Sequence, residues 1–260
     1  MTPRPPLDVE RLRARLADRF PRIDVVDEAA STNAELLSDR SAPDLSVLVA
    51  EYQNAGRGRF DRTWVSPPRA GLTFSVLVRP PRPRAQWGWL PLLAGVAVAE
   101  AVHASTGAAV SLKWPNDVLA TDGRKLAGIL VQTIEDAAVV GIGMNVSTEA
   151  TELPVDTATS LRLAGAETDR TELLVACLLR IEGRVREWTA SGSNAAAAAY
   201  RQLSATLGSP VRVTPVGAVM FEGTAVDVDL NGHLLVRTAD ALRAVGAGEV
   251  EHLRQAPSTG

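Results

Sequence analysis

The residues best suited to binding an anion lie in a short glycine-rich segment in the first quarter of the chain. Arg57, Arg59 and Arg62 occur within six residues, interleaved with Gly56 and Gly58. Arginine presents paired N–H donors that match a carboxylate or a phosphate, and glycine lets backbone N–H groups approach an anion closely. The segment has little periodicity, so we expect a mobile loop. Taken alone, it fits a solvated surface loop equally well.

A second polar cluster follows a predicted strand in the middle of the chain. The segment 113–117 reads KWPND and places Asn116 and Asp117 at a strand end, where open sheets often collect ligand-binding groups. Lys125 precedes the apolar run LAGIL at 126–130, which predicts a further strand. Each feature also has a purely structural explanation: an Asx-type turn for Asn116-Asp117 and a flanking charge for Lys125.

Several common kinds of active site are missing from the sequence. There is no phosphate loop of the G-x-x-x-x-G-K-[ST] type and no G-x-S-x-G elbow. Gly141-Ile142-Gly143 lacks the third glycine of a dinucleotide site. The three histidines are widely separated, and the single cysteine, Cys177, lies in an apolar helical stretch. We therefore expect no resident metal and no covalent enzyme intermediate.

The elements that must position these residues can be predicted from periodicity and caps. Strands are expected at IDVVDEA, LSVLVAEYQ, GLTFSVLVRP, AAVSLKW, VLA, KLAGILVQT and AAVVGIGMNV. The VLA and KLAGILVQT runs should form a hairpin across Asp122-Gly123, and the unbroken apolar character of AAVVGIGMNV indicates a central strand. Helices are expected after the N-caps Asp8 and Ser31, over about 87–105, through TELLVACLLRIEGRVREW and within 191–206.

The sequence pattern changes after Gly208, from helical periodicity to short β-like runs. Short β-like runs separated by turn signals, including Asn231-Gly232, predict five strands in about fifty residues, which is the size of a small SH3-like β-barrel. The predicted fold class is thus α+β. A mixed β-sheet catalytic domain with helices packed on it spans residues 1–206, and the small β domain spans 207–260.

Bulk composition excludes some partners. The chain has 260 residues, of which 46% are hydrophobic, and a formal net charge of −3, so overall charge provides no attraction to nucleic acid or to an anionic membrane. The N-terminus lacks a signal-peptide core, and no uninterrupted apolar run reaches membrane-spanning length. We expect a cytoplasmic protein that binds neither nucleic acid nor membrane and is a monomer or a weak homodimer.

In their order and spacing, these motifs together resemble the biotin protein ligases. The resemblance rests on Ser31-Thr32-Asn33, the run EYQNAGRGR at 51–59, Arg62-Thr63-Trp64, KWPND, KLAGIL at 125–130 and GIGMNV at 141–146. It covers about residues 23–150 closely and extends more loosely through the C-terminal β domain. The GRGR-x-x-R-x-W loop combined with KWPND and KLAGIL is its most specific part.

The resemblance implies an activity and assigns roles to residues. The enzyme would use ATP and Mg²⁺ to convert biotin to biotinyl-5′-AMP, and would then transfer biotin to a lysine of an apo biotin carboxyl carrier protein. Lys125 and Arg59 would be catalytic. Biotin would be bound by Ser31, Thr32, Asn33, Gln53, Gly56, Arg57, Gly58, Arg59, Lys125 and Gly128. ATP and the adenylate would be bound by Arg59, Arg62, Trp64, Asn116, Lys125 and Asn145.

One departure from part of that family and two rival functions remain. Many relatives carry an N-terminal helix-turn-helix, whereas only about twenty residues precede the first predicted strand here, so we expect no repressor activity. A lipoate or octanoate ligase or transferase shares the fold, but the polar set Ser31, Thr32 and Gln53 favours biotin. A non-catalytic phosphate- or RNA-binding module is disfavoured by the net charge and the lack of interleaved aromatic residues.

Overall fold

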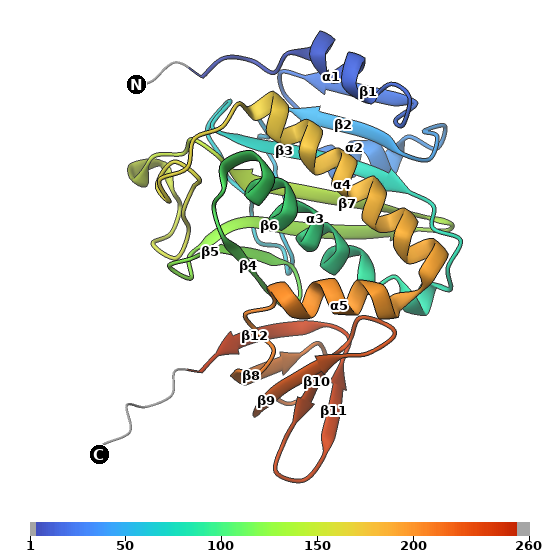
Figure 1. Cartoon of the computed structure of the whole chain (residues 1–260), viewed down its shortest axis with the longest axis vertical. Helices are drawn as coiled ribbons and strands as arrows, with labels where there is room; N and C mark the ends of the chain where they lie inside the picture. The colour runs from blue at the N-terminus through green and yellow to red at the C-terminus, as the bar shows by residue number, and fades with distance from the viewer. Residues whose placement is uncertain (1–3, 254–260) are drawn as a thin grey trace.

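A seven-stranded mixed sheet forms the centre of the larger part of the molecule (Figure 1). The computed structural model describes residues 4–253. The strand order is β1-β2-β3-β7-β6-β5-β4. β1 and β2 are parallel, and every other neighbouring pair is antiparallel. The strands are β1 Arg22–Val26, β2 Ser46–Ala50, β3 Gly71–Val78, β4 Val110–Lys113, β5 Asp117–Ala120, β6 Lys125–Ile134 and β7 Ala137–Asn145.

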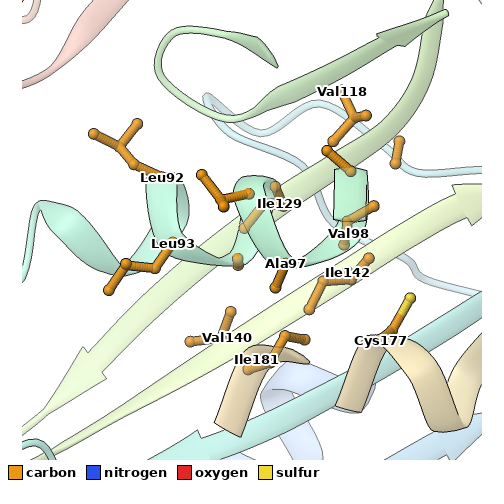
Figure 2. Close-up of a cluster of buried hydrophobic side chains, with 14 of the residues drawn as sticks. Leu92, Leu93, Ala97, Val98, Val118, Ile129, Val140, Ile142, Cys177 and Ile181 are labelled. Atoms are coloured by element: carbon orange, nitrogen blue, oxygen red, sulfur yellow. The ribbon is translucent and has the colours of Figure 1, made fainter. Parts of the chain in front are cut away.

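The predicted central strand is confirmed, because β7 is the middle strand of the seven and all nine of its residues are buried. Its two faces have different neighbours. Figure 2 shows Val140 and Ile142 of β7 directed toward Ala97 of α3 and Ile181 of α4. Successive side chains of a strand point to opposite faces, so Gly141 and the other odd-numbered residues face away from this core.

Five α-helices are present among the described residues, at or near the predicted places. They are α1 Val9–Leu16, α2 Thr32–Ser38, α3 Trp89–Thr106, α4 Arg170–Ser191 and α5 Ser193–Leu203. Both predicted N-caps are confirmed: the Asp8 side chain accepts from the N–H of Arg11, and the Ser31 side chain accepts from that of Ala34. Short 3₁₀ turns occur at η1 Arg84–Gln86 and η2 Ala150–Glu152. α3 and α4 pack together over one face of the sheet, whereas α2 packs against β2, β3 and β7 (Figure 1).

The apolar run of helix α3 is interrupted by Glu100, in keeping with the expectation that no uninterrupted apolar run reaches membrane-spanning length. In the described part of the chain it is the single helix that is long and apolar enough to cross a bilayer, yet 67% of it is buried inside the protein. It spans Trp89–Thr106 and is followed by the C-cap Gly107, which has a left-handed φ of 73°. Glycine adopts this conformation without a steric penalty. α3 is therefore a core helix that is apolar all round because α4, α5 and the sheet surround it.

The C-terminal region contains the five predicted strands as one antiparallel sheet. They are β8 Pro210–Pro215, β9 Phe221–Val228, β10 Leu234–Arg237, β11 Leu242–Val245 and β12 Gly248–His252, in the order β11-β10-β9-β8-β12. This agrees with the small SH3-like β domain predicted from the sequence, and within residues 4–253 no pairing between the edge strands β11 and β12 is present.

The turn between β9 and β10 attaches this small sheet to the larger part. The indole N–H of Trp89 donates to the carbonyl of Leu230 at 3.0 Å, and that of Trp114 donates to the carbonyl of Gly232 at 3.3 Å. Gly232 has a φ of 82°, and a Cβ at this position would lie 2.6 Å from the backbone of Gly88. The predicted Asn231-Gly232 turn is thus also a docking contact. The boundary between residues 206 and 207 stays a prediction.

Candidate active site

The predicted site residues meet in one cavity of about 780 Å³ on the face of the central sheet that is opposite the α3–α4 core. All of them line it except Gly56. The lining includes Ser31, Thr32, Asn33, Gln53, Arg57, Gly58, Arg59, Arg62, Trp64, Asn116, Lys125, Gly128 and Asn145. Gly56 contributes packing instead, because a Cβ there would lie 2.4 Å from the carbonyl oxygen of Trp64 and 2.8 Å from the Gln53 amide nitrogen.

Strand β7 runs along the cavity and contributes residues to its floor. Gly141, Gly143 and Asn145 are alternate residues that face the cavity, and each step of two residues advances about 6.5 to 7 Å along the strand. A Cβ on Gly141 would lie 2.0 Å from the Asn33 side chain, and one on Gly143 would lie 2.4 Å from the Trp64 ring. The two glycines therefore provide a flat floor on which these side chains rest.

The end of the cavity near Gly141 is polar and uncharged; we call it the neutral end, formed by Ser31, Thr32, Asn33 and Gln53. The backbone N–H of Thr32 donates to Gln53 Oε1 at 2.7 Å, and the Thr32 hydroxyl lies 3.1 Å from the same oxygen. Ser31, Thr32 and Asn33 are each about 4% exposed or less. Their positions are set by the start of helix α2, which the Ser31 cap fixes.

Asn33 is held by three further residues that the sequence analysis did not single out for binding. Its amide nitrogen donates to the carbonyl of Leu130 at 3.0 Å and to Gln132 Oε1 at 3.1 Å. Its amide oxygen accepts from the hydroxyl of Ser75 at 2.6 Å. Such a fully bonded, buried amide has a defined orientation.

The other end of the cavity carries cations; we call it the charged end, formed by Arg57, Arg59, Arg62 and Lys125. Lys125 Nζ lies 2.6 Å from Asp117 Oδ1, and 5.9 Å from the centre of the Trp64 ring. A Cβ on Gly128 would lie 3.1 Å from Nζ, so the lysine side chain folds back along β6 over this glycine. Lys125 Nζ thereby lies beside Gly128, whose register partner is Gly143 on β7.

The two sides of the arginine loop are joined to each other by backbone hydrogen bonds. Arg57 and Thr63 form an isolated antiparallel bridge, and the N–H of Gly58 donates to the carbonyl of Arg62 at 2.6 Å. Phe60 and Asp61 at its tip have φ values of 54° and 56°, a region that costs non-glycine residues energy. This strained tip is compatible with the mobility predicted from the sequence, which stays a prediction.

Arg59 is the most enclosed cation of the loop. Its guanidinium donates to Asn116 Oδ1 at 3.4 Å and lies 4.7 Å from the centre of the Phe60 ring. Burial lowers its pKa, an effect that the carboxylates of Asp117 and Glu249 oppose. An arginine keeps its charge in proteins, so a partly desolvated cation faces the cavity and is available to an anion.

The two asparagines predicted to face nucleotide also fix strand ends. The Asn116 amide donates to the carbonyl of Ile129 at 2.8 Å, and the Asn145 amide donates to the carbonyl of Thr159 at 2.9 Å. Thr159 closes the segment 147–159, whose Pro154, Val155, Thr157 and Ala158 form a wall of the cavity. The sequence analysis treated that segment only as a loop.

The C-terminal sheet contributes to the charged end, which the sequence analysis did not predict. Glu249 and Glu251 of β12 line the cavity, and Glu249 forms an ion pair with Arg62 of the arginine loop. Asp117 was noticed only as part of KWPND, although its ion pair holds Lys125. No local signal marks Glu249, because its place beside Arg62 depends on how the two sheets dock.

Over residues 4–253 there is no group of three or more histidine, cysteine, aspartate or glutamate side chains that could hold a metal ion. Cys177 is fully buried, and burial raises its thiol pKa to about 12, so it is not a nucleophile. The chemistry available in the cavity is therefore anion binding, charge neutralisation and recognition by hydrogen bonds.

Comparison with protein families gives two matches. Residues 23–148 match the biotin/lipoate A/B protein ligase family, and residues 206–253 match the biotin protein ligase C-terminal domain. These segments contain the predicted motifs and the five-stranded sheet respectively.

Individual proteins and structures agree. A biotin–[acetyl-CoA-carboxylase] ligase of Mycobacterium tuberculosis is 41% identical over 96% of this chain and 97% of its own length. A bifunctional ligase/repressor BirA of Bacillus spizizenii is 33% identical over 88% of this chain and 72% of its own length. The structure of an Aquifex aeolicus biotin protein ligase in complex with biotin and ATP has a TM-score of 0.78 and 30% identity, covering 91% of this chain and all (100%) of the other.

Proposed function

This chain belongs to the biotin protein ligase family, and on that premise we propose how its cavity performs the reaction. The enzyme is a biotin–[acetyl-CoA-carboxylase] ligase: it activates biotin with ATP and attaches it to a lysine of an apo biotin carboxyl carrier protein. We assign biotin's ring to the neutral end, its carboxylate to the neighbourhood of Lys125 and the nucleotide to the charged end.

The observation that carries this assignment is the continuity of the cavity. One space of about 780 Å³ joins the uncharged hydrogen-bonding groups of the neutral end to five cations, which are Lys113 and the four of the charged end. Biotin has the matching order of groups, with a neutral ureido ring at one end and a carboxylate at the other. Gly141 and Gly143 leave room for the Asn33 amide and the Trp64 ring to lie against the strand, so these two side chains are placed beside the space that the biotin ring would occupy.

The first step joins two anions, so electrostatics dominates it. A carboxylate oxygen attacks the α-phosphorus of ATP, an O–P bond forms, and the bond to pyrophosphate breaks. Lys125, held by Asp117 at 2.6 Å, neutralises the carboxylate and the developing charge at phosphorus. Arg59, partly desolvated and bonded to Asn116, supports the same phosphate from the other side.

The second step requires that water be kept away from the mixed anhydride. The lysine amine of the carrier attacks the activated carbonyl carbon, AMP leaves with the bonding pair, and the amine loses a proton. The arginine loop and the 147–159 wall enclose the charged end, and Trp64 covers Gly143 and Gly128. A loop able to open for the substrate and close over the adenylate satisfies both needs.

Magnesium belongs to this scheme as the companion of the triphosphate. The described residues offer no cluster of ligands for it, and Mg²⁺ commonly binds through substrate phosphates and water with only one or two carboxylates. We therefore propose that it enters with ATP, and we derive no step through it. The carrier's identity, the oligomeric state, a cytoplasmic location and the absence of repressor activity stay predictions.

A lipoate ligase is the second candidate, because the matched family model includes both activities. The neutral end favours biotin. Thr32 is buried, Gln53 is half-buried, and the two are joined by hydrogen bonds. A dithiolane ring has no N–H or C=O group for the hydrogen-bonding capacity that remains at this end, and each polar group that it desolvates without a partner costs about 1–3 kcal/mol. A ureido ring satisfies these groups.

The direct test is a mass-spectrometric assay with biotin, Mg-ATP and an apo biotin carboxyl carrier domain. We expect a biotin-sized mass gain on the carrier that depends on ATP and is accompanied by pyrophosphate release. Lipoate replaces biotin in a parallel reaction with a lipoyl domain. Modification by lipoate alone would transfer the assignment to the second candidate, and no pyrophosphate with either acid would refute both.

A further inference from the structure

Ser75 lies directly beneath the neutral end without lining the cavity. It is on β3, is 0% exposed, and is the register partner of Gly141 on β7. Its hydroxyl oxygen lies 2.6 Å from Asn33 Oδ1 and 2.7 Å from the Thr32 hydroxyl oxygen. Because Gly141 has no side chain, the Asn33 amide occupies the space above this residue pair and reaches Ser75. Ser75 thus connects two of the lining residues from below.

The hydrogen-bond partners of Asn33 decide where the proton of Ser75 goes. The Asn33 amide nitrogen faces the carbonyl of Leu130, which only accepts, so the amide oxygen must face Ser75. An amide oxygen also only accepts. The single hydroxyl proton of Ser75 is therefore committed to Asn33, and the Ser75 oxygen is left as an acceptor toward Thr32.

The direction of the Thr32 hydroxyl proton is set in the same way, by the acceptors around it. Its hydroxyl is within reach of two acceptors, the Ser75 oxygen at 2.7 Å and Gln53 Oε1 at 3.1 Å. The orientation of the Gln53 amide is fixed by the backbone N–H of Thr32. This N–H donates at 2.7 Å, so the atom that faces it must be the amide oxygen, Oε1. The Thr32 proton is consumed by one of these two oxygens, and a lone pair of the hydroxyl remains for the cavity.

We infer that Ser75 is a positioning residue that makes Thr32 a hydrogen-bond acceptor and thereby selects a ligand ring that donates an N–H. The inference deepens the proposed function and rests on it: the selected group is one ureido N–H of biotin. Selection follows from polarity, because a ring atom that only accepts would face the Thr32 lone pair without a proton between them. A dithiolane ring offers no donor at all.

The test compares Ser75→Ala with Ser46→Ala as a matched control. Ser46 is also 0% exposed and makes one side-chain hydrogen bond, to the carbonyl of Pro43 at 2.7 Å, but it is not part of the cavity lining. We expect Ser75→Ala to raise the KM for biotin roughly five- to tenfold, as loss of one ordering hydrogen bond implies. The KM for ATP should change by less than about twofold, as should both constants in Ser46→Ala.

A second measurement separates polarity from loosened packing. The ligands are biotin and its two cyclic carbamate analogues, in which one or the other ureido N–H is replaced by a ring oxygen of similar size. In the wild type we expect strong preference for biotin over one of the two analogues. In Ser75→Ala the Thr32 hydroxyl keeps only its longer contact with Gln53 Oε1, at 3.1 Å. Its proton can then turn toward the ligand more readily, so that preference should fall by the same five- to tenfold factor.

The outcomes that overturn the inference are distinct from failure of the proposed function. An unchanged preference in folded Ser75→Ala overturns the role of Ser75. If that variant does not fold, Thr32→Val gives the answer: it removes the acceptor, so a retained preference for the N–H ring overturns the inference. A wild-type protein that forms no adenylate from biotin refutes the proposed function instead.

Discussion

The two ends of the cavity are built in opposite ways. At the neutral end, Thr32 and Asn33 are buried at the start of a capped helix, and their polar atoms are bonded to Gln53 and Ser75. At the charged end, the arginines extend from a loop with a strained tip, and Arg62 has a side chain that is 69% exposed. The polar groups of the neutral end are held by hydrogen bonds inside the fold, whereas the charged end is enclosed by a loop that we predict to be mobile.

This difference corresponds to the role that we propose for each end. Recognition of a neutral ring depends on the orientation of a few hydrogen bonds, which a preordered network provides at low entropic cost. Handling a triphosphate and a water-sensitive anhydride requires entry, enclosure and release, which a loop provides. Substitutions at the neutral end should therefore change which acid is bound, whereas those at the charged end should change the rate and the fate of the adenylate.

The largest effect is expected from Lys125→Ala, which tests whether the two ends of the cavity have separate roles. Removal of this cation should lower the adenylation rate by about 10²- to 10³-fold while biotin still binds at the intact neutral end. Pyrophosphate release measures the rate, and equilibrium binding measures biotin. Arg124→Ala is the control, because this neighbouring cation pairs with Asp122 at 2.8 Å and does not line the cavity. Adenylation at the wild-type rate by Lys125→Ala would contradict its assigned role.

Two floor glycines allow the ends to be disturbed separately. In Gly141→Ala the new Cβ would lie 2.0 Å from Asn33 Oδ1, whose amide cannot move freely, so the KM for biotin should rise by up to about 10²-fold. In Gly143→Ala it would meet the Trp64 ring, which can shift with its loop, so ATP use should suffer more than biotin binding. Gly183→Ala is the control, with nothing within 4 Å. If Gly141→Ala and Gly143→Ala affected biotin and ATP equally, the proposed separation between a biotin end and a nucleotide end would be wrong.

A smaller effect is expected from Arg59→Gly at the charged end. Loss of the guanidinium that bonds Asn116 should loosen the loop and release biotinyl-AMP, by analogy with other ordered closing loops. Biotin attached to bystander proteins, measured by mass spectrometry, should rise by about tenfold or less. Arg84→Gly is the control: Arg84 also stacks on an aromatic ring, that of Trp87 at 4.9 Å, but outside the cavity. Strict carrier specificity in Arg59→Gly would defeat the retention role.

The smallest effect concerns the contact between the loop and the C-terminal sheet. Glu249→Gln removes the ion pair with Arg62, whose two side chains are 69% and 40% exposed. Exposed pairs contribute about 1 kcal/mol or less, so the KM for ATP should change by less than about fivefold, and the change should shrink as ionic strength rises. Measurement of KM at low and high salt tests this, and Arg62→Gln should have the larger effect because it also removes a cation of the charged end. A larger, salt-independent loss would make the charged end more rigid than we describe.

Local signals were sufficient for most of the scaffold. The N-caps Asp8 and Ser31, the Asp122-Gly123 hairpin and the apolar β7 were predicted from residue type and spacing, and each is present. These features depend on neighbours within a few residues along the chain. The motif residues were likewise found from the sequence, and the structure gathers all but Gly56 around one cavity.

Other features depended on residues distant in sequence. Ser75 sits in the run GLTFSVLVRP with no signal that separates it from any strand serine, and its role arises only because β3 pairs with β7 beneath α2. Glu249 reaches Arg62 only because the two sheets dock.

The sequence by itself determined the helices, the strands, the motif residues and the family, because each is encoded in local composition or in the order of short motifs. The tertiary structure decided which of these residues share an end of the cavity, which buried group contacts them from below, and that the C-terminal sheet docks beside the arginine loop. These outcomes follow from packing between segments more than forty residues apart, such as Thr32 and Ser75, and no local pattern of residue types specifies such contacts.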